Sequence, residues 1–143
     1  MNIANTLNPL DRGWEKFKGG PTRTRADILY VTINSKGAIN MNRRAHQALG
    51  EPAAVAVYYN REIDSIALEP AFERSNESFP VAEHQGRFNI RISPFCRHHN
   101  IKVPMTVRFV RPEIRDGRLI LGLRETVTTG GIAAKRGRTD VLE

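Results

Sequence analysis

The stretch ILYVTINSKGAINMNRRAHQALGEPAAVAVYYNREIDSIALEP, residues 28–70, decides the fold. Apolar and polar residues alternate over residues 29–33, which predicts a half-buried strand with one apolar and one wet face. Residues 35–37, Ser-Lys-Gly, turn the chain, and the alternation resumes over residues 39–41. The stretch therefore begins as two short strands joined by a turn.

A short helix and a hairpin complete this unit. Asn42 suits the N-cap position, because its side chain can accept a hydrogen bond from a backbone N–H of the first turn. Gly50 suits the position just after the helix, where glycine adopts the left-handed conformation without penalty. Residues 55–59 and 66–68 alternate again around a polar turn, and Pro70 is expected to end the second strand. We read the stretch as a βαββ unit.

A second segment, residues 86–125, repeats the plan of the first. Residues 86–90, GRFNI, match residues 37–41, GAINM, at an offset of 49 residues, and each begins with a turn glycine followed by an apolar-Asn-apolar strand. Each copy alone is too small to bury its sheet, and two adjacent copies can cover one another. We therefore expect a tandem duplication that forms a pseudo-dimer within one chain.

The second copy carries its own helix and turn signals. Pro94 suits a helix start and Asn100 the position after its end. Residues 105–109 alternate as a strand whose Met105 is expected to face the core. The Asp-Gly pair at 116–117 predicts a hairpin turn before another strand at residues 119–123.

The rest of the chain is polar. We expect five segments: a basic N-terminal arm (1–27), the first copy (28–70), a linker (71–85), the second copy (86–125) and a flexible C-terminal tail (126–143). The arm's large aromatic residues, Trp14 and Phe17, are expected to pack back onto the folded part, since large aromatic side chains gain most from burial. The alternative is that they contact a nucleic acid.

Residues 31–37 (VTINSKG), the Leu-Gly pair at 49–50 and residues 66–70 (IALEP) resemble the AbrB-like, swapped-hairpin DNA-binding domains of bacterial and archaeal regulators and antitoxins. The resemblance spans the 43 residues of the first copy. It implies a mainly β fold with short helices, in which the tandem βαββ copies form an AbrB-like swapped-hairpin barrel. It also implies a DNA-binding function.

The sequence departs from the family at several positions. The family usually has Pro at the position of Asn42, and Gly-Asp at residues 53–54, which are Ala-Ala here. At three positions where the family typically has basic residues that contact DNA, this sequence has Ala38, His46 and Gln47. These departures leave open a module that binds a protein partner instead of DNA.

The chain is strongly basic. Its 143 residues contain 22 Lys and Arg against 15 Asp and Glu, a formal net charge of +7, which favours a polyanionic partner. Residues 28–70 hold four basic and four acidic residues, whereas residues 91–124 hold eight basic and two acidic. In the second copy, we expect Arg108, Arg118 and Arg124 to form a stripe on adjacent strands.

These observations predict a DNA-binding protein, either an AbrB-like transcriptional regulator or a nucleoid-associated factor, that contacts duplex DNA. The candidate nucleic-acid-binding residues are Lys36, Arg43, Arg44, Arg87, Arg91, Arg97, Arg108, Arg118 and Arg124. The alternative is a structural or antitoxin-like module that has lost its DNA contacts and holds a protein partner through its N- or C-terminal arm. Homo-oligomerisation is compatible with both.

No pattern in the sequence predicts catalysis, a cofactor or a metal. The cluster Cys96-Arg97-His98-His99 lacks the four converging ligands of structural zinc, and Cys96 suits a small buried position. No phosphate-binding loop, dinucleotide fingerprint or paired-carboxylate motif is found, so we do not expect an enzyme. One cysteine, no signal peptide and no membrane-length apolar run favour a cytoplasmic protein without membrane contact.

Overall fold

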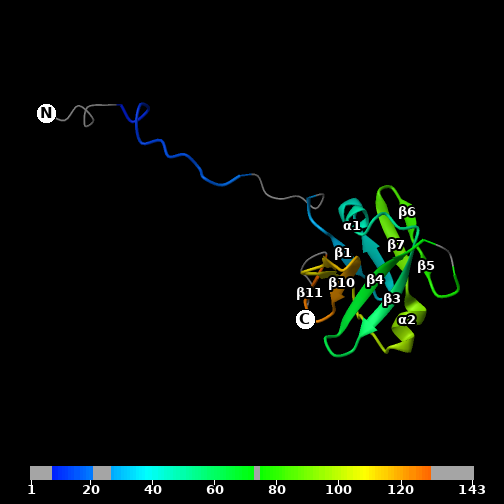
Figure 1. The fold of residues 1–143 in the computed structure, drawn as a ribbon. Helices are drawn as coiled ribbons and strands as arrows, with labels where there is room; N and C mark the ends of the chain where they lie inside the picture. The colour runs from blue at the N-terminus through cyan, green and yellow to red at the C-terminus, as the bar shows by residue number, and fades with distance from the viewer. Residues whose placement is uncertain (1–7, 21–26, 73–74, 130–143) are drawn as a thin grey trace.

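The computed structural model describes residues 8–20, 27–72 and 75–129, and over these ranges the fold is mainly β (Figure 1). The elements are β1 (Val31–Ile33), β2 (Ala38–Met41), α1 (Arg43–Ala48), β3 (Ala54–Asn60), β4 (Ser65–Ala71), β5 (Phe79–Pro80), β6 (Ala82–His84), β7 (Arg87–Arg91), α2 (Ser93–His98), β8 (Val107–Phe109), β9 (Glu113–Arg115), β10 (Arg118–Gly122) and β11 (Thr126–Thr128). The mainly β class with two short helices is confirmed.

The strands form two antiparallel sheets. Sheet A has the order β11-β8-β1-β2-β7-β6, and sheet B has the order β5-β3-β4-β10-β9. Both sheets mix strands from the two halves of the chain, because β2 pairs with β7, β1 with β8, and β4 with β10. Neither half therefore forms a sheet of its own.

Two contacts between the halves join residues that are 49 positions apart. Asn40 and Asn89 are opposite one another on β2 and β7, and their side chains are hydrogen-bonded. Arg118 at the start of β10 donates a hydrogen bond to Glu69 on β4. This is the offset at which the two glycine-led strand sequences match.

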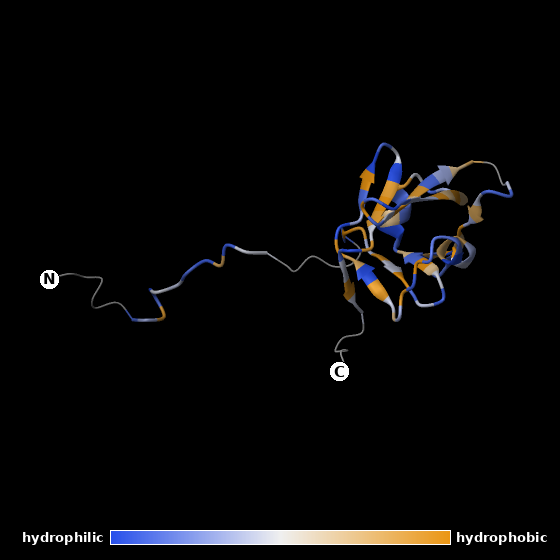
Figure 2. Cartoon of the chain, turned by 90° about the horizontal axis from the view of Figure 1, so that it is seen from below, coloured by the Kyte–Doolittle hydropathy of each residue, from blue (hydrophilic) through white to orange (hydrophobic). Residues whose placement is uncertain are grey.

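The core lies between the inner faces of the two sheets. Buried residues alternate with more exposed ones along β1, β7 and β10, and Figure 2 shows hydrophobic and hydrophilic residues intermixed in the folded part. The largest fully buried side chains are Val31, Ile33, Ile39, Val55, Ile66, Leu68, Ile90, Ile92, Phe109, Leu119 and Leu121. Burial of each such side chain contributes about 1.5–3 kcal/mol, before the entropic cost of folding. The residues between them on the strands lie on the opposite faces of the sheets.

The local signals around α1 are confirmed. The Asn42 Oδ1 accepts a hydrogen bond from the Ala45 N–H at 3.0 Å, so Asn42 is the N-cap. The same oxygen accepts from the Tyr30 N–H at 3.2 Å, and the Asn42 Nδ2 donates to the Ile28 carbonyl at 2.8 Å. Asn42 thus fixes the helix start to the segment that leads into β1. Gly50 follows the helix with φ of 96°.

The turn signals of the second half are confirmed as well. Pro94 lies in the first turn of α2, and Asn100 follows the helix with φ of 56°. Asp116 and Gly117, with φ of 54° and 77°, form the turn between β9 and β10. Positive φ at both positions is the geometry of a two-residue type I′ hairpin turn.

The predicted closed barrel is not found among the described residues. Strand pairing ends at β11 and β6 in sheet A and at β5 and β9 in sheet B. Proline accounts for one of these edges, because Pro80 in β5 lacks an N–H for a further ladder bond. The two sheets are therefore separate, with open edges.

Several predicted boundaries are wrong. The expected linker contains β5 and β6, and β4 continues through Ala71, one residue past Pro70. Met105 is 47% exposed instead of facing the core, because β8 begins only at Val107. Within the predicted tail, residues 126–128 form β11, and residues 130–143 lie outside the described part of the chain.

The arm does not place its aromatic residues in the core. Trp14 and Phe17 are 78% and 79% exposed, so the prediction that they pack back is wrong. The Trp14 indole N–H donates to the Leu10 carbonyl at 3.0 Å, a local contact within the arm. Residues 8–20 contain neither helix nor strand.

Two glycines with positive φ allow a stability prediction. A Cβ at Gly50 would meet open space, whereas one at Gly37 (φ 77°) would lie 2.9 Å from the Ser93 Cα. Gly50→Ala should cost about 1 kcal/mol of unfolding free energy from backbone strain alone. Gly37→Ala should cost more than about 2 kcal/mol, because the backbone of α2 must also move. Urea unfolding of both variants checks this, and equal losses would contradict the contact between Gly37 and α2.

Candidate nucleic-acid interface

One row of polar side chains crosses the middle of sheet A. In register, Arg108 of β8 is opposite Thr32 of β1, Thr32 is opposite Asn40 of β2, and Asn40 is opposite Asn89 of β7. Their sequence neighbours, such as Ile39, point into the core. Because side chains alternate along a strand, the row lies on the opposite face, which we call the outer face of sheet A.

The centre of the outer face is an asparagine pair. The Asn89 Nδ2 donates a hydrogen bond to the Asn40 Oδ1 at 2.9 Å. An amide side chain has two donors and one acceptor oxygen. The Asn40 Nδ2 and the Asn89 Oδ1 therefore add one donor group and one acceptor to the outer face.

Arginines flank the asparagine pair. Arg87 and Arg91 are exposed on β7, two residues on either side of Asn89. On β8, the Arg108 guanidinium lies 5.8 Å from the centroid of the Tyr30 ring. Tyr30, Thr32, Asn40 and Arg87 also line a shallow pocket of about 720 Å³ that continues to Arg44 on α1. The face thus combines cations with neutral donors and acceptors.

Charge is segregated between the two sheets. The strands of sheet A and the two helices contain six arginines and one acidic residue, Glu83. Glu83 is opposite the buried Phe88 and lies 3.6 Å from Arg43, so its carboxylate is off the outer face. The strands of sheet B contain two arginines and two glutamates. On the strands alone, Arg87, Arg91 and Arg108 lie on the outer face of sheet A with no carboxylate among them, whereas arginine and glutamate balance in sheet B.

The structure brings most of the predicted site residues to sheet A and its flanks. These are Lys36 in the β1–β2 turn, Arg43 and Arg44 on α1, Arg87 and Arg91 on β7, Arg97 on α2 and Arg108 on β8. Lys36 and Arg97 lie with Lys102 around a second pocket of about 260 Å³, between the β1–β2 turn and α2.

The predicted stripe of Arg108, Arg118 and Arg124 is wrong. Arg108 lies on β8 in sheet A, whereas Arg118 lies on β10 in sheet B and Arg124 follows β10. The strands were expected to be neighbours because they are close in sequence. Instead, β8 pairs with β1 and β11, while β10 pairs with β4 and β9.

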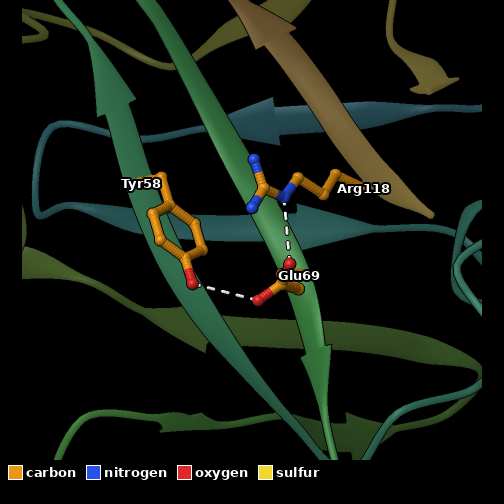
Figure 3. Close-up of polar contacts among 3 residues, drawn as sticks. All are labelled: Tyr58, Glu69 and Arg118. Atoms are coloured by element: carbon orange, nitrogen blue, oxygen red, sulfur yellow. Dashed lines mark hydrogen bonds and ion pairs between the residues drawn. The ribbon is translucent and has the colours of Figure 1, made fainter. Parts of the chain in front are cut away.

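Arg118 is held by a polar trio on sheet B (Figure 3). Its Nε donates to the Glu69 Oε2 at 3.0 Å, and the Tyr58 hydroxyl donates to the Glu69 Oε1 at 3.0 Å. The guanidinium also lies 4.6 Å from the Tyr58 ring centroid. Arg124 donates to the Glu62 carbonyl at 3.5 Å. These two arginines therefore have intramolecular partners.

The trio changes the acidity of its members. The hydrogen bond from Arg118, followed by that from Tyr58, lowers the pKa of Glu69, because both favour the charged carboxylate. In turn, donation to Glu69 raises the pKa of the Tyr58 hydroxyl. The trio is a charge-neutralised surface contact.

The Cys-His cluster has a packing role. Cys96 is 7% exposed, and burial raises the pKa of its thiol. His99 packs against Phe95 and Tyr59, and burial, followed by the nearby His98, lowers its pKa.

In the parts of the chain that the structure describes, no group of three potential metal ligands converges. None of the helices there has the length and apolar character of a membrane-spanning segment.

Sequence reasoning missed the neutral residues of the outer face: Tyr30, Thr32, Asn40 and Asn89. A signal was present, because Asn40 and Asn89 occupy the same place in the two matching apolar-Asn-apolar strands. Only the antiparallel pairing of β2 with β7 makes the two positions adjacent.

Comparison of the chain with protein-family models, with curated proteins and with solved structures finds no match.

The trio predicts a pH effect. Because the folded-state pKa of Glu69 is lowered, the trio stabilises the fold above the unfolded-state pKa, about 4.3, and this contribution is lost as the pH falls through the folded-state value. Arg118→Gln should raise the pKa of Glu69. The loss of unfolding free energy between neutral and acidic pH should then be smaller, because less of it comes from protonation of Glu69. Carboxyl NMR titration measures the first effect and urea unfolding at neutral and acidic pH the second.

Arg115→Gln is the matched control, because Arg115 lies 3.9 Å from Glu113 and not in the trio. It should leave the titration of Glu69 unchanged. An unaltered Glu69 titration in Arg118→Gln would contradict the role given to Arg118.

Proposed function

We propose that this protein binds double-stranded DNA through the outer face of sheet A. The observation that carries the proposal is the charge on the strands: three arginines, Arg87, Arg91 and Arg108, on the outer face of sheet A, against two arginines and two glutamates on the strands of sheet B. A concentrated positive face attracts the phosphate backbone and gains free energy from counterion release. No carboxylate lies among the strand residues of the outer face.

The dimensions of the face suit a segment of duplex. Six strands at about 4.8 Å spacing span about 24 Å, the length of roughly seven base-pair steps. Arg87, Arg91 and Arg108 would contact phosphates and fix the position of the duplex. Asn40 and Asn89 offer a donor and an acceptor toward the base edges in a groove.

The face suits a duplex better than a single strand. Single-strand platforms present several aromatic rings on which successive bases stack. Here Tyr30 has the Arg108 guanidinium over its ring, and its neighbours in the central row are Thr32, Asn40 and Asn89. Phosphate contact therefore dominates over base stacking.

An AbrB-like origin by tandem duplication, and a role in transcription regulation or nucleoid organisation, belong to the same proposal. The 49-residue spacing of the Asn40–Asn89 pair and the two six-residue helices support it. The family's basic position beside the turn glycine is Ala38 in the first copy and Arg87 in the second. His46, at another such position, instead stacks on Phe88 at 3.8 Å between ring centroids.

Replacing the two exposed arginines of β7 tests the proposal. Arg87→Gln with Arg91→Gln should weaken binding to all duplex sequences alike, because phosphate contacts carry no sequence information. The slope of log affinity against log salt should become shallower by about two. Fluorescence anisotropy with random duplex DNA at several salt concentrations measures both effects.

Arg61→Gln with Arg111→Gln is the matched control, since it removes the same charge from positions outside the strands of sheet A. It should change affinity much less than the β7 variant. Equal effects would show that net charge and not the outer face governs binding. Absence of salt-sensitive binding by the unmodified protein would end the DNA proposal in favour of a protein partner.

A further inference from the structure

The open edge of sheet B is the strand β9. All three of its residues, Glu113, Ile114 and Arg115, are exposed, and its only partner among the described strands is β10. An open edge presents unpaired backbone groups that can pair with another strand. Whether it does so depends on the side chains that the pairing would bring together.

The charges of β9 are self-complementary. In an antiparallel pair of two β9 strands centred on Ile114, Glu113 of each copy is opposite Arg115 of the other. The remaining edges lack this property. β6 would place Glu83 opposite itself, β5 contains Pro80, and β11 has the uncharged sequence Thr-Val-Thr.

The backbone direction also fits. Arg115 and Arg118 flank the two-residue turn between β9 and β10, and such flanking residues form a hydrogen-bonded pair. Hydrogen-bonded and non-hydrogen-bonded pairs alternate along an antiparallel ladder. The N–H and C=O of Ile114 therefore point away from β10, toward the open edge, where a second Ile114 could exchange both bonds.

Apolar side chains lie at the same edge. Ile114 is 36% exposed and Val110 41% exposed, and with Pro112 they line an open pocket of about 1170 Å³. A second copy paired along β9 would bring its own Ile114 to this pocket and remove apolar surface from water. The backbone, charge and apolar features of the edge thus agree on one occupant.

We propose that this protein forms a two-fold dimer by antiparallel pairing of β9 with β9 of a second copy, which extends sheet B across both molecules. The contact is short, so the dimer is weak and forms at high protein concentration. The strand pairing uses sheet B, although the pocket beside Ile114 is also lined by Arg108 and Arg44. The test of the dimer is made without DNA, and its test variants change only residues of β9, so it does not depend on DNA binding.

Charge reversal on β9 tests the dimer. Sedimentation velocity without DNA, over about 10–500 μM protein, should show a concentration-dependent dimer of the unmodified chain. Arg115→Glu or Glu113→Arg alone should weaken it at least about tenfold, because like charges then meet across the two-fold axis. An equimolar mixture of these two variants should form a heterodimer, and Glu113→Arg combined with Arg115→Glu should restore the homodimer.

The mixture of the two single variants and the double variant distinguish the proposal from misfolding, because a misfolded variant would not regain association with its complement. Lys102→Glu is the matched control, since it makes the same charge change as Arg115→Glu on an exposed residue outside sheet B. It should leave dimerisation unchanged. A monomer at every concentration, or a dimer insensitive to both single reversals, would overturn the proposal.

Discussion

The pairing of β2 with β7 is the constraint on which the rest of the structure depends. It joins the two halves in the middle of sheet A, and the Asn40–Asn89 hydrogen bond lies on its outer side while Ile39 and Ile90 lie on its inner side. The pairings of β1 with β8 and of β4 with β10 join the same two halves. Each half thus supplies the apolar surface that the other needs for burial.

Features that depend on local chemistry could be predicted from the sequence. The Asn42 cap, the left-handed Gly50 and the Asp-Gly turn at 116–117 each follow from what a few neighbouring residues can do, and all are present. Features that depend on long-range pairing could not. β5 and β6 are too short to show a period, and nothing near Arg108 indicates that β8 joins sheet A while β10 joins sheet B.

The distribution of charge shows the same limit. Counted along the sequence, the excess of positive charge is in the second half, whereas in space the arginines of that half are divided between the two sheets. The two differ because each sheet takes strands from both halves, so Arg43 and Arg44 of the first half accompany Arg87 of the second. Arg118, which contributes to the count, is neutralised by Glu69 from the first half.

The mixing of the halves also affects when the protein can fold during synthesis. Residues 28–70 leave the ribosome first, and β1 and β2 can pair with each other, but their other neighbours, β8 and β7, are missing until residues 87–109 have followed. Sheet B is likewise incomplete until β10 is available. Contacts between residues so distant in sequence slow folding, because a long loop must close before they form. The emerging chain therefore exposes apolar strands for most of its synthesis, the stage at which chaperones act.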